Sequence, residues 1–511
     1  MKALFKFVVL CCCLFVFGIN VNAGDVSVAP VFQSHMVLQQ NAPIRIWGTA
    51  DINSEIEVEL DGNIKTITAN TDGEWEVVFP KKKASFTPIK LRVNQKKFTD
   101  ILIGELWLCS GQSNMAWTVQ KSDYNEHIEN CDNPNLRLLR MGSIRAQAKD
   151  GYTQEELARC NTQDFFKGIW QVSKPNTVKG FSAVAWNMGN KLSQDLNVPV
   201  GIILVAVGGS AINNWIPPAT LKKCPLTADL YKTDWLSNEY VFKNHKKRAK
   251  LAFQNVLNEG EPYIPGEMPY RWMCEPGFLF EAGIQPLGKL EFRGVAWYQG
   301  ESDAYNDTVA LNYEKLFKLM INSWRELFDN VKLPFIYVQL PGYNSKPWTV
   351  MREVQRRASF DIPNTSMIVT IDLGLKDNIH PHDKTVVGER LAHTALREIY
   401  KEKELQEFPS IKKISLKNNS MSVRFSGCKD GWQTVKDNIP GFEIKSVNGD
   451  YTPVNASISD DNIIVLKYND IVPAGIRYGW TPFPEPPLKL FNKSGLPLGP
   501  FTVDIKANSD L

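Results

Sequence analysis

The spacing of apolar and polar residues divides the chain into three stretches. From residue 24 to about residue 100, short segments such as "EIEVELDGN" and "KTITANTDGEWEVVFP" alternate in period two between Asp-Gly and Asn-Gly-type breaks. This alternation predicts a small antiparallel β domain. The same alternation returns after about residue 406, in "SMSVRFSG", "GFEIKSV" and "NIIVLKYND". We therefore expect a second β-rich domain over residues 406–511.

Between residues 101 and 405, apolar runs alternate with amphipathic stretches. Strands that alternate with helices predict an α/β domain in which helices cover both faces of a parallel sheet. Residues 215–290 are rich in Pro, Trp and Lys, and we expect them to be an insertion beside the site. The predicted strands are Ile101–Leu108, Val200–Val207, Gly294–Tyr298, Phe335–Leu340 and Met367–Ile371, and the predicted helices include Ser182–Leu196, Asn312–Phe328 and Val386–Tyr400.

The first 23 residues have the pattern of a secretory signal peptide. Lys2 and Lys6 form a basic region, residues 7–17 are an apolar core, and Val21-Asn22-Ala23 resembles a cleavage site. This core is too short for a comfortable membrane span, so we expect cleavage, with an uncleaved anchor as the alternative. The protein is therefore expected to be exported to the periplasm or the cell exterior, with no stable membrane span after cleavage.

Charge and cysteine content narrow the possible partners. Loss of residues 1–23 removes two lysines and no acid, which lowers the net charge from +3 to +1. A nearly neutral protein has no electrostatic basis for binding nucleic acid. Six cysteines remain, and their spacing matches no metal-binding or redox motif, although export permits disulfides. Cys109, at the end of a predicted buried strand, is expected to be a packed thiol.

The stretch "CSGQSNMAW" directly follows the first apolar run of the α/β region and contains Ser113. Open α/β sheets place their active sites at such strand ends, although a simple turn also fits the pattern. A serine hydroxyl is a poor nucleophile unless a base takes its proton. The serine is therefore a candidate only if a histidine accompanies it.

The best candidate base lies in "DNIHPHDK", just beyond the last predicted strand. There Asp377 precedes His380 by three residues, so that its carboxylate could accept the Nδ1 proton and leave Nε2 facing Ser113. His382 is an alternative base with a less suitable spacing, and a solvated loop is the alternative interpretation of the motif. The remaining histidines lie in the β domain, in polar stretches or inside a predicted helix: His35, His127, His245 and His393.

Two further strand ends offer hydrogen-bond donors for an oxyanion. In "VAVGGSAINNW" the backbone N–H groups at Gly208 and Gly209 can approach a ligand closely, and in "WYQGESD" Gln299 carries a side-chain amide. A tight turn and a local hydrogen bond are the respective alternatives. Glu301 is expected to support the second loop.

Taken together, "GELWLCSGQSNMAW", "VGGSAINNW", "WYQGESDA" and "DNIHPHDKTVVGERLA" resemble the sialate O-acetylesterase family of the SGNH hydrolase superfamily. The resemblance covers nearly the whole chain after the signal segment. It implies a flavodoxin-like parallel sheet flanked by the two β-rich parts. It also implies Ser113 as nucleophile, His380 as base and Asp377 as its partner, with Ser113 N–H, Gly209 and Gln299 as oxyanion donors.

The sequence also departs from the wider superfamily. It has Gly-Gln-Ser in place of Gly-Asp-Ser, and Gln-Gly-Glu-Ser where the superfamily has Gly-x-Asn, which weakens the assignment of Gln299. Arg352, in "WTVMREVQ", matches a family arginine. Arg352 and Glu301 are therefore candidate substrate contacts, and a surface or helix-packing role is the alternative for Arg352.

These observations predict a serine esterase that needs no metal or cofactor and removes acetyl groups from sugar hydroxyls. The resemblance implies O-acetylated sialic acid as substrate, above all its 9-O-acetyl ester. An acetyl-xylan or other polysaccharide deacetylase is the alternative enzyme. A carbohydrate-binding protein without activity is the alternative from another class, favoured by the β-rich flanks and the many aromatic residues but opposed by the complete set of site motifs.

Overall fold

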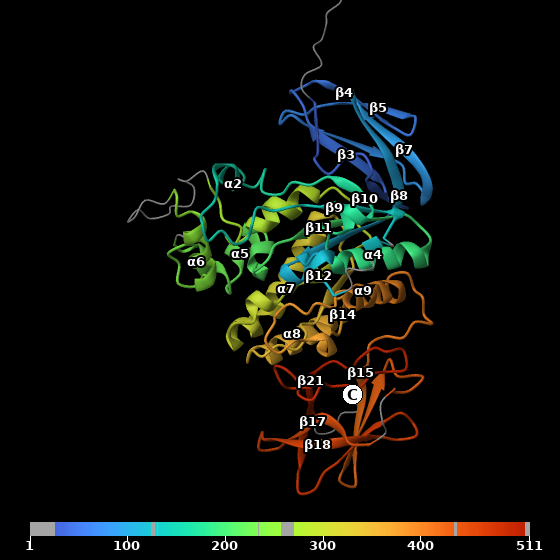
Figure 1. Ribbon diagram of the computed structural model, residues 1–511, viewed down its shortest axis with the longest axis vertical. Coiled ribbons are helices and arrows are strands. Elements are labelled where there is room, and N and C mark those ends of the chain that lie inside the picture. The colour runs from blue at the N-terminus through green and yellow to red at the C-terminus, as the bar shows by residue number, and fades with distance from the viewer. Residues whose placement is uncertain are drawn as a thin grey trace, which may run out of the picture.

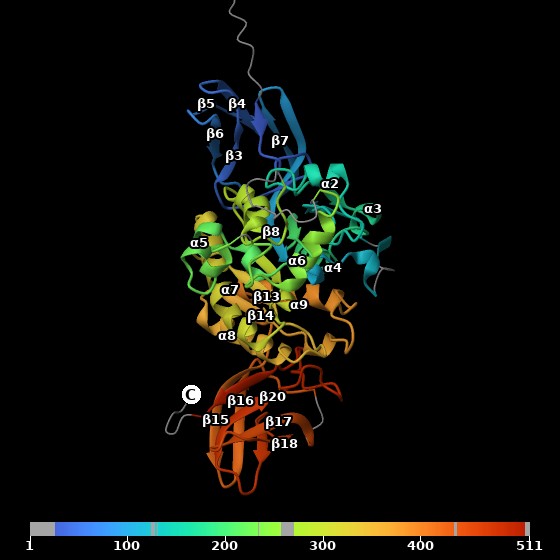
Figure 2. The same ribbon diagram turned by 90° about the vertical axis from the view of Figure 1, so that its left-hand side faces the viewer.

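The computed structural model describes residues 26–123, 128–129, 131–233, 235–256, 270–433 and 437–505. The predicted signal segment, residues 1–23, lies outside them. Figures 1 and 2 show three parts stacked along the long axis, namely an N-terminal β part, a central α/β part and a C-terminal β part. None of the helices within the described ranges is long and apolar enough to cross a bilayer.

The N-terminal part is built from short strands whose alternate side chains are buried. In β6, for example, Trp75, Val77 and Phe79 point into the core while the residues between them are more exposed. Strands β1, β3 and β6 form one sheet, and β4 pairs with β5 and β7. The strands are β1 (Ser27–Val28), β2 (Val37–Gln39), β3 (Ile44–Thr49), β4 (Glu55–Leu60), β5 (Asn63–Thr68), β6 (Glu74–Phe79) and β7 (Ser85–Val93).

Strand β8 (Lys96–Gly111) runs from the N-terminal part into the central part. Its first half pairs with β7 and β2, and its second half pairs with β11 (Val200–Ala206) and β12 (Gly294–Tyr298). The predicted division at residues 100 and 101 therefore falls inside a single strand. Buried apolar side chains of the two parts also form one continuous core.

The central sheet has the strand order β10-β9-β11-β8-β12-β13-β14. All neighbours are parallel except β10, which pairs antiparallel with β9 at the edge, so the sheet is mixed rather than purely parallel as predicted. An antiparallel edge strand needs no crossover helix. The chain between β9 and β10, all of it within the described ranges, accordingly contains a single short helix, α2 (Gln154–Ala158). The remaining strands are β9 (Asn133–Arg140), β10 (Trp170–Ser173), β13 (Phe335–Val338) and β14 (Thr365–Ile368).

Two pairs of helices cover the sheet. Helix α4 (Ala183–Leu196) packs on α9 (Thr385–Glu398), and α7 (Asp307–Leu327) packs on α8 (Trp348–Asp361). Figures 1 and 2 show the two pairs on opposite sides of the sheet, as the pattern predicts. The shorter helices of this part are α1 (Ser113–Ala116), α3 (Pro175–Val178), α5 (Pro218–Lys223) and α6 (Lys243–Ala252), of which α5 and α6 belong to the predicted insertion.

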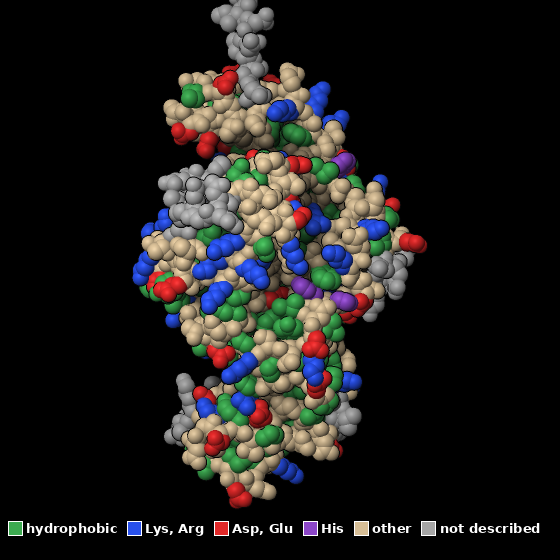
Figure 3. Space-filling view, turned by 60° about the vertical axis from the view of Figure 1, so that its left-hand side comes forward, with side chains coloured by type: hydrophobic (Ala, Val, Ile, Leu, Met, Phe, Trp, Pro, Cys, Tyr) green, Lys and Arg blue, Asp and Glu red, His purple; other side chains and the backbone are tan. Residues whose placement is uncertain are grey.

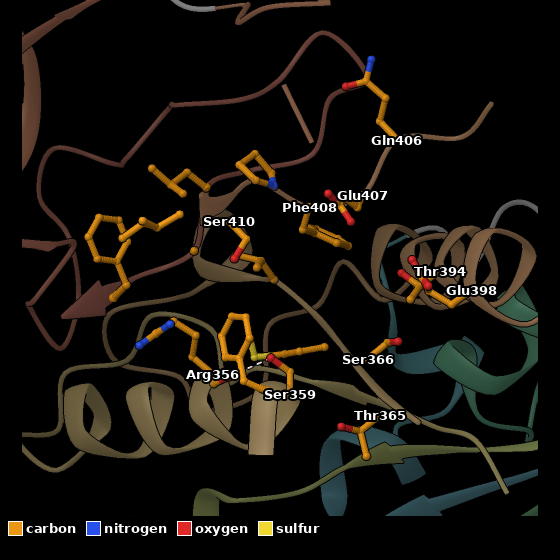
Figure 4. Close-up of a pocket in the computed structure, with 18 of the residues that line it drawn as sticks. Arg356, Ser359, Thr365, Ser366, Thr394, Glu398, Gln406, Glu407, Phe408 and Ser410 are labelled. Atoms are coloured by element: carbon orange, nitrogen blue, oxygen red, sulfur yellow. Dashed lines mark hydrogen bonds between the residues drawn. The ribbon is translucent and has the colours of Figure 1, made fainter. Parts of the chain in front are cut away.

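The C-terminal part is an antiparallel sheet with the strand order β15-β16-β19-β18-β17-β20-β21 and a core largely of its own. The chain between α9 and β15 leads into this part, and there a cavity of about 210 Å³ lies between α8, α9 and residues 406–411 (Figure 4). Its lining includes neither Ser113 nor His380. The strands are β15 (Ser410–Lys417), β16 (Ser420–Ser426), β17 (Ile439–Ser446), β18 (Tyr451–Ile458), β19 (Ile464–Lys467), β20 (Pro473–Tyr478) and β21 (Phe501–Asp504).

Candidate active site

Ser113 lies at the carboxyl end of β8, between the ends of β11 and β12. The chain turns at Gly111, where φ is +140°, and a Cβ there would lie 2.1 Å from the carbonyl oxygen of Tyr298 on β12. Glycine is therefore required for the two strands to approach this closely. The turn leads directly into α1, which begins at Ser113, so the serine lies at the strand end where ligands bind in open α/β sheets.

The structure brings Ser113 and His380 together as predicted. The Nε2 atom of His380 lies 2.8 Å from the Oγ atom of Ser113. The loop is held in place because the Oδ1 atom of Asn378 accepts a hydrogen bond from His380 N–H at 2.9 Å. The ring of Trp117 stacks on the imidazole, with centroids 4.9 Å apart and an interplanar angle of 21°. This arrangement allows Nε2 to take the proton from the Ser113 hydroxyl.

The surroundings of His380 keep its imidazole neutral. Burial, together with the smaller effects of the charges of Lys384, His382 and Lys121, lowers its pKa to about 4. A histidine with so low a pKa is unprotonated at neutral pH, which is the form that a general base needs.

The structure does not form the predicted hydrogen bond between Asp377 and His380. The Asp377 side chain is exposed, and among the described residues the Nδ1 atom of His380 has no hydrogen-bond partner. The turn made by Asn378 directs the start of this loop toward solvent. The spacing of the motif alone does not reveal this turn.

The Gly208–Gly209 turn lies beside Ser113. A Cβ at Gly208 would lie 3.6 Å from Ser113 Cβ, and Gly209 has a φ of +74°. Side chains of α6 hold both carbonyl groups: Arg248 donates to the oxygens of Gly208 and Gly209 at 3.3 and 3.4 Å, and His245 Nε2 lies 2.8 Å from the Gly209 oxygen. Within the described ranges the N–H of Gly209 has no protein acceptor, so it is available to an oxyanion.

The side chain of Gln299 is already engaged and does not offer a free donor. Its Nε2 atom lies 3.2 Å from Gln112 Oε1, 3.1 Å from Ser210 O and 2.6 Å from Asp303 Oδ2. Its Oε1 atom accepts a hydrogen bond from the hydroxyl of Tyr313 at 2.9 Å. Because an amide has only two N–H groups, the predicted oxyanion role of Gln299 does not fit this arrangement. The residue instead ties three strand-end loops together.

A buried network behind Ser113 contains Glu301 and a lysine that the sequence motifs did not identify. Asn114 donates to Glu301 Oε1 at 2.6 Å and to the Ile379 oxygen at 3.0 Å, and it accepts from Lys384 Nζ at 2.6 Å. Burial raises the pKa of Glu301 to about 7 and lowers the pKa of Lys384 to about 7. Glu301 is buried and contacts the Ser113 turn through Asn114. The side chains of Asn114, Glu301 and Lys384, with the Ile379 carbonyl, join the Ser113 turn to the His380 loop.

Arg352 connects the central part to the C-terminal part. It is fully buried on α8, where its guanidinium donates to the backbone oxygens of Thr481 and Pro482 in the C-terminal part. Burial lowers its pKa to about 9. The structure thus gives Arg352 the helix-packing role that was the alternative to a substrate contact, since two of its nitrogens donate to the C-terminal part.

The described residues include no group of three or more His, Cys, Asp or Glu side chains that could hold a metal ion. The six cysteines outside the signal segment, including Cys109 at the end of β8, are free thiols. Figure 3 shows histidine side chains next to a hollow on the middle part of the molecule, with Lys and Arg side chains around it.

A serine hydrogen-bonded to a neutral histidine beside free backbone N–H groups is the arrangement of serine hydrolases. The comparison with known families agrees, since residues 103–257 and 262–397 match the family described as "Carbohydrate esterase, sialic acid-specific acetylesterase". The chain belongs to this family, and it is a carboxylic ester hydrolase.

Relatives resemble the protein over nearly its whole length. Sialate O-acetylesterase from Mus musculus is 29% identical, over 89% of this chain and 90% of the relative. The enzyme from Homo sapiens is 27% identical, over 93% and 91%. Among solved structures, a carbohydrate acetylesterase from Xanthomonas citri superposes with a TM-score of 0.75 at 26% identity, covering 94% of this chain and all of that one. The Xanthomonas citri structure thus shares the fold of this chain over nearly its whole length.

Proposed function

We propose that the protein hydrolyses O-acetyl esters of sialic acids, with Ser113 as nucleophile and His380 as general base. The observation that carries this proposal is the 2.8 Å contact between Ser113 Oγ and His380 Nε2. The relatives named sialate O-acetylesterase support the choice of sugar, because the similarity extends over about nine tenths of both chains.

In the proposed reaction, His380 Nε2 removes the proton of the Ser113 hydroxyl as Oγ attacks the acetyl carbonyl carbon. The N–H groups of Ser113 and Gly209 donate to the oxyanion. The imidazolium then gives its proton to the departing sugar oxygen, which leaves an acetyl group on Ser113. A water molecule, deprotonated by His380, attacks the carbonyl carbon of this ester, and the imidazolium returns the proton to Ser113 Oγ as acetate is released.

Asp377 is included in the proposal as the group that binds Nδ1 of His380 once substrate is present. The unpartnered Nδ1 atom supports this role, since a protonated imidazole is more stable beside a carboxylate.

We further propose that the central part is of SGNH type. Five neighbouring strands of its sheet lie in the order β11-β8-β12-β13-β14. When these five are renumbered 1 to 5 by their position in the sequence, this order is 2-1-3-4-5, as in flavodoxin-like sheets.

Ser113→Ala tests the proposed reaction. We expect the variant to lose hydrolysis of an aryl acetate and of 9-O-acetylated sialic acid while its thermal unfolding stays unchanged. An active Ser113→Ala protein would overturn the assignment. Asn114→Ala, which leaves the hydroxyl in place, is a control for disturbance of the neighbouring network and is expected to keep measurable activity.

Rates of acetate release from different acetylated sugars test both the preferred ester position and the preferred sugar. We propose preference for the 9-O-acetyl ester, which predicts faster acetate release from 9-O-acetylated than from 4-O-acetylated sialic acid. The neighbour from Xanthomonas citri, named a carbohydrate acetylesterase, favours acetylated polysaccharides as a second candidate substrate class. Faster release from acetyl-xylan than from either sialic acid ester would favour that second class.

We also propose export. The support is the signal-like sequence of residues 1–23. N-terminal sequencing of the protein secreted by its native host is expected to begin close to residue 24.

A further inference from the structure

A second cavity, of about 680 Å³, is lined in part by His245, whose ring contacts the carbonyl oxygen of Gly209. Its wall includes Ala211, His245 and Asp303. The Nε2 atom of His245 is hydrogen-bonded to the Gly209 carbonyl oxygen at 2.8 Å, and Asp303 Oδ2 accepts a hydrogen bond from the backbone N–H of Ile212 at 2.9 Å. Two side chains of the cavity wall thus contact the loop that follows β11, which also contains the Gly208–Gly209 turn beside Ser113. Its volume lies in the range of about 300–1,000 Å³ that is typical of small-molecule sites.

The cavity is lined by aromatic side chains that keep open surface. Phe242 and Tyr305 stack on each other, with centroids 4.4 Å apart and an interplanar angle of 18°. Tyr305 is nevertheless 42% exposed, and Tyr240 is 56% exposed. Rings at the edge of a cavity can pack on the C–H face of a pyranose while their hydroxyls remain in water.

Polar side chains complete the lining. The Oδ1 atom of Asn213, next to the oxyanion turn, is buried without a hydrogen-bond partner among the described residues. Asn312 and Lys243 offer donors, and Asp229 and Glu239 offer acceptors. Such side chains suit sugar hydroxyls, which both donate and accept. Asp229 is paired with Lys232 at 2.5 Å, but Glu239 and Asp303 still outnumber Lys243, which disfavours a carboxylated sugar because like charges repel.

We propose that this cavity binds the neutral pyranose unit adjacent to the acetylated sugar of a glycan. The inference rests on the proposed function for the position of the acetylated sugar, since it places that sugar at Ser113. Binding of the neighbouring unit itself depends only on Tyr240, Tyr305 and the polar lining. The esterase is therefore expected to act better on acetyl groups within an oligosaccharide than on the free monosaccharide.

The kinetic test compares 9-O-acetylated sialyllactose with free 9-O-acetylated sialic acid. We expect Tyr240→Ala and Tyr305→Ala to lower kcat/KM for the sialyllactose by about three- to tenfold, mainly through KM. Their kcat/KM for the free sugar and for an aryl acetate should stay unchanged. Phe86→Ala, which removes an exposed ring of the N-terminal part, is the matched control and should change none of the three. Equal losses on all substrates, or no loss on sialyllactose, would overturn the proposal.

A binding measurement separates this proposal from the proposed reaction. Saturation-transfer NMR with lactose or xylobiose needs no turnover and can be carried out on Ser113→Ala. A signal in Ser113→Ala that is lost after the further change Tyr240→Ala or Tyr305→Ala supports the cavity, even if no acetylated sugar is hydrolysed. Absence of a signal with both disaccharides, or a signal that survives both changes, contradicts it.

Discussion

At the scale of single residues, the surroundings of His380 determine how activity depends on pH. A protonated imidazole cannot accept the Ser113 proton, so kcat/KM should fall as the pH falls through the pKa of His380. With that pKa at about 4, activity on an aryl acetate should stay on a plateau down to mildly acidic pH and reach half its maximum near pH 4. A half-maximum near pH 6.5 would contradict this expectation.

The same profile tests the contribution of Lys121. Its positive charge lowers the pKa of His380, so Lys121→Gln should raise this pKa and move the acid limb to higher pH. The plateau rate should change little, because no step assigns Lys121 a proton. Lys65→Gln, an exposed lysine of the N-terminal part, should leave the limb unmoved.

The role of Asp377 gives a separate prediction. If its carboxylate binds Nδ1 during the reaction, Asp377→Ala should lower kcat by about 10²-fold. This loss is at the low end of the range for acid–base groups, because the Asp377 side chain is exposed to solvent. Asp383→Ala, in the same loop, is the control. Full activity of Asp377→Ala would mean that Ser113 and His380 act as a pair.

The residues of the site differ in how far the sequence could predict them. Ser113 and His380 were predictable because each follows a strand-like run within a short polar motif. Gln299 was misassigned because no local pattern shows that Asp303 and the Ser210 carbonyl occupy its N–H groups. Lys384 is four residues from His380, but it is buried against Asn114, a residue far away in sequence, and no local pattern shows this contact.

At the scale of elements, α6 holds the turn that supplies an oxyanion donor. The N–H of Gly209 and the carbonyl of Gly208 belong to one planar peptide, so holding the carbonyl with Arg248 also orients the N–H. Arg248→Met should lower kcat by about 10- to 10²-fold with little change in KM, less than the about 10²–10³-fold expected when a donor is removed altogether.

Two comparisons make this test specific. Lys250→Met, on the exposed face of the same helix, should leave kcat unchanged. Arg248→Lys keeps the charge but has a single ammonium in place of the forked guanidinium, so it should recover only part of the rate. An Arg248→Met protein as active as the wild type would exclude a positioning role.

Helix and strand positions were predicted best where a regular pattern was accompanied by a cap or a glycine. Helix α4 begins one residue after the predicted start, since the Ser182 hydroxyl accepts from the N–H of Ala185 and acts as its N-cap. Helix α7 begins five residues early because Asn306 caps it. Helix α8 was not predicted: its buried face carries Arg352, Glu353 and Gln355, whose polarity conceals the amphipathic pattern.

At the scale of the whole molecule, Arg352 fastens the C-terminal part to the central part. Arg352→Met leaves the carbonyls of Thr481 and Pro482 without their donor, and it should lower the free energy of unfolding by about 1–3 kcal/mol. Thermal unfolding measures this loss, and kcat on an aryl acetate should stay unchanged at temperatures where the variant is folded. Arg357→Met, on the exposed side of α8, is the control.

The overall class of the molecule was predictable, because period-two segments flank a region of alternating strands and helices. The connection between its parts was not. Strand β8 was expected to start at residue 101, yet it begins at Lys96, since the polar residues at its start pair with β7 at the edge of the N-terminal sheet. Which strands pair is a long-range property, and no window of sequence around residue 100 contains it.

The course of β8 has a consequence for how the protein matures during synthesis. The strands that pair with its first half, β2 and β7, precede it in the chain, whereas β11 and β12 follow about 90 and 185 residues later. His380 emerges later still. A nascent or prematurely terminated chain can thus complete its N-terminal sheet and still lack a formed nucleophile turn, so hydrolytic activity is acquired only near the end of translation.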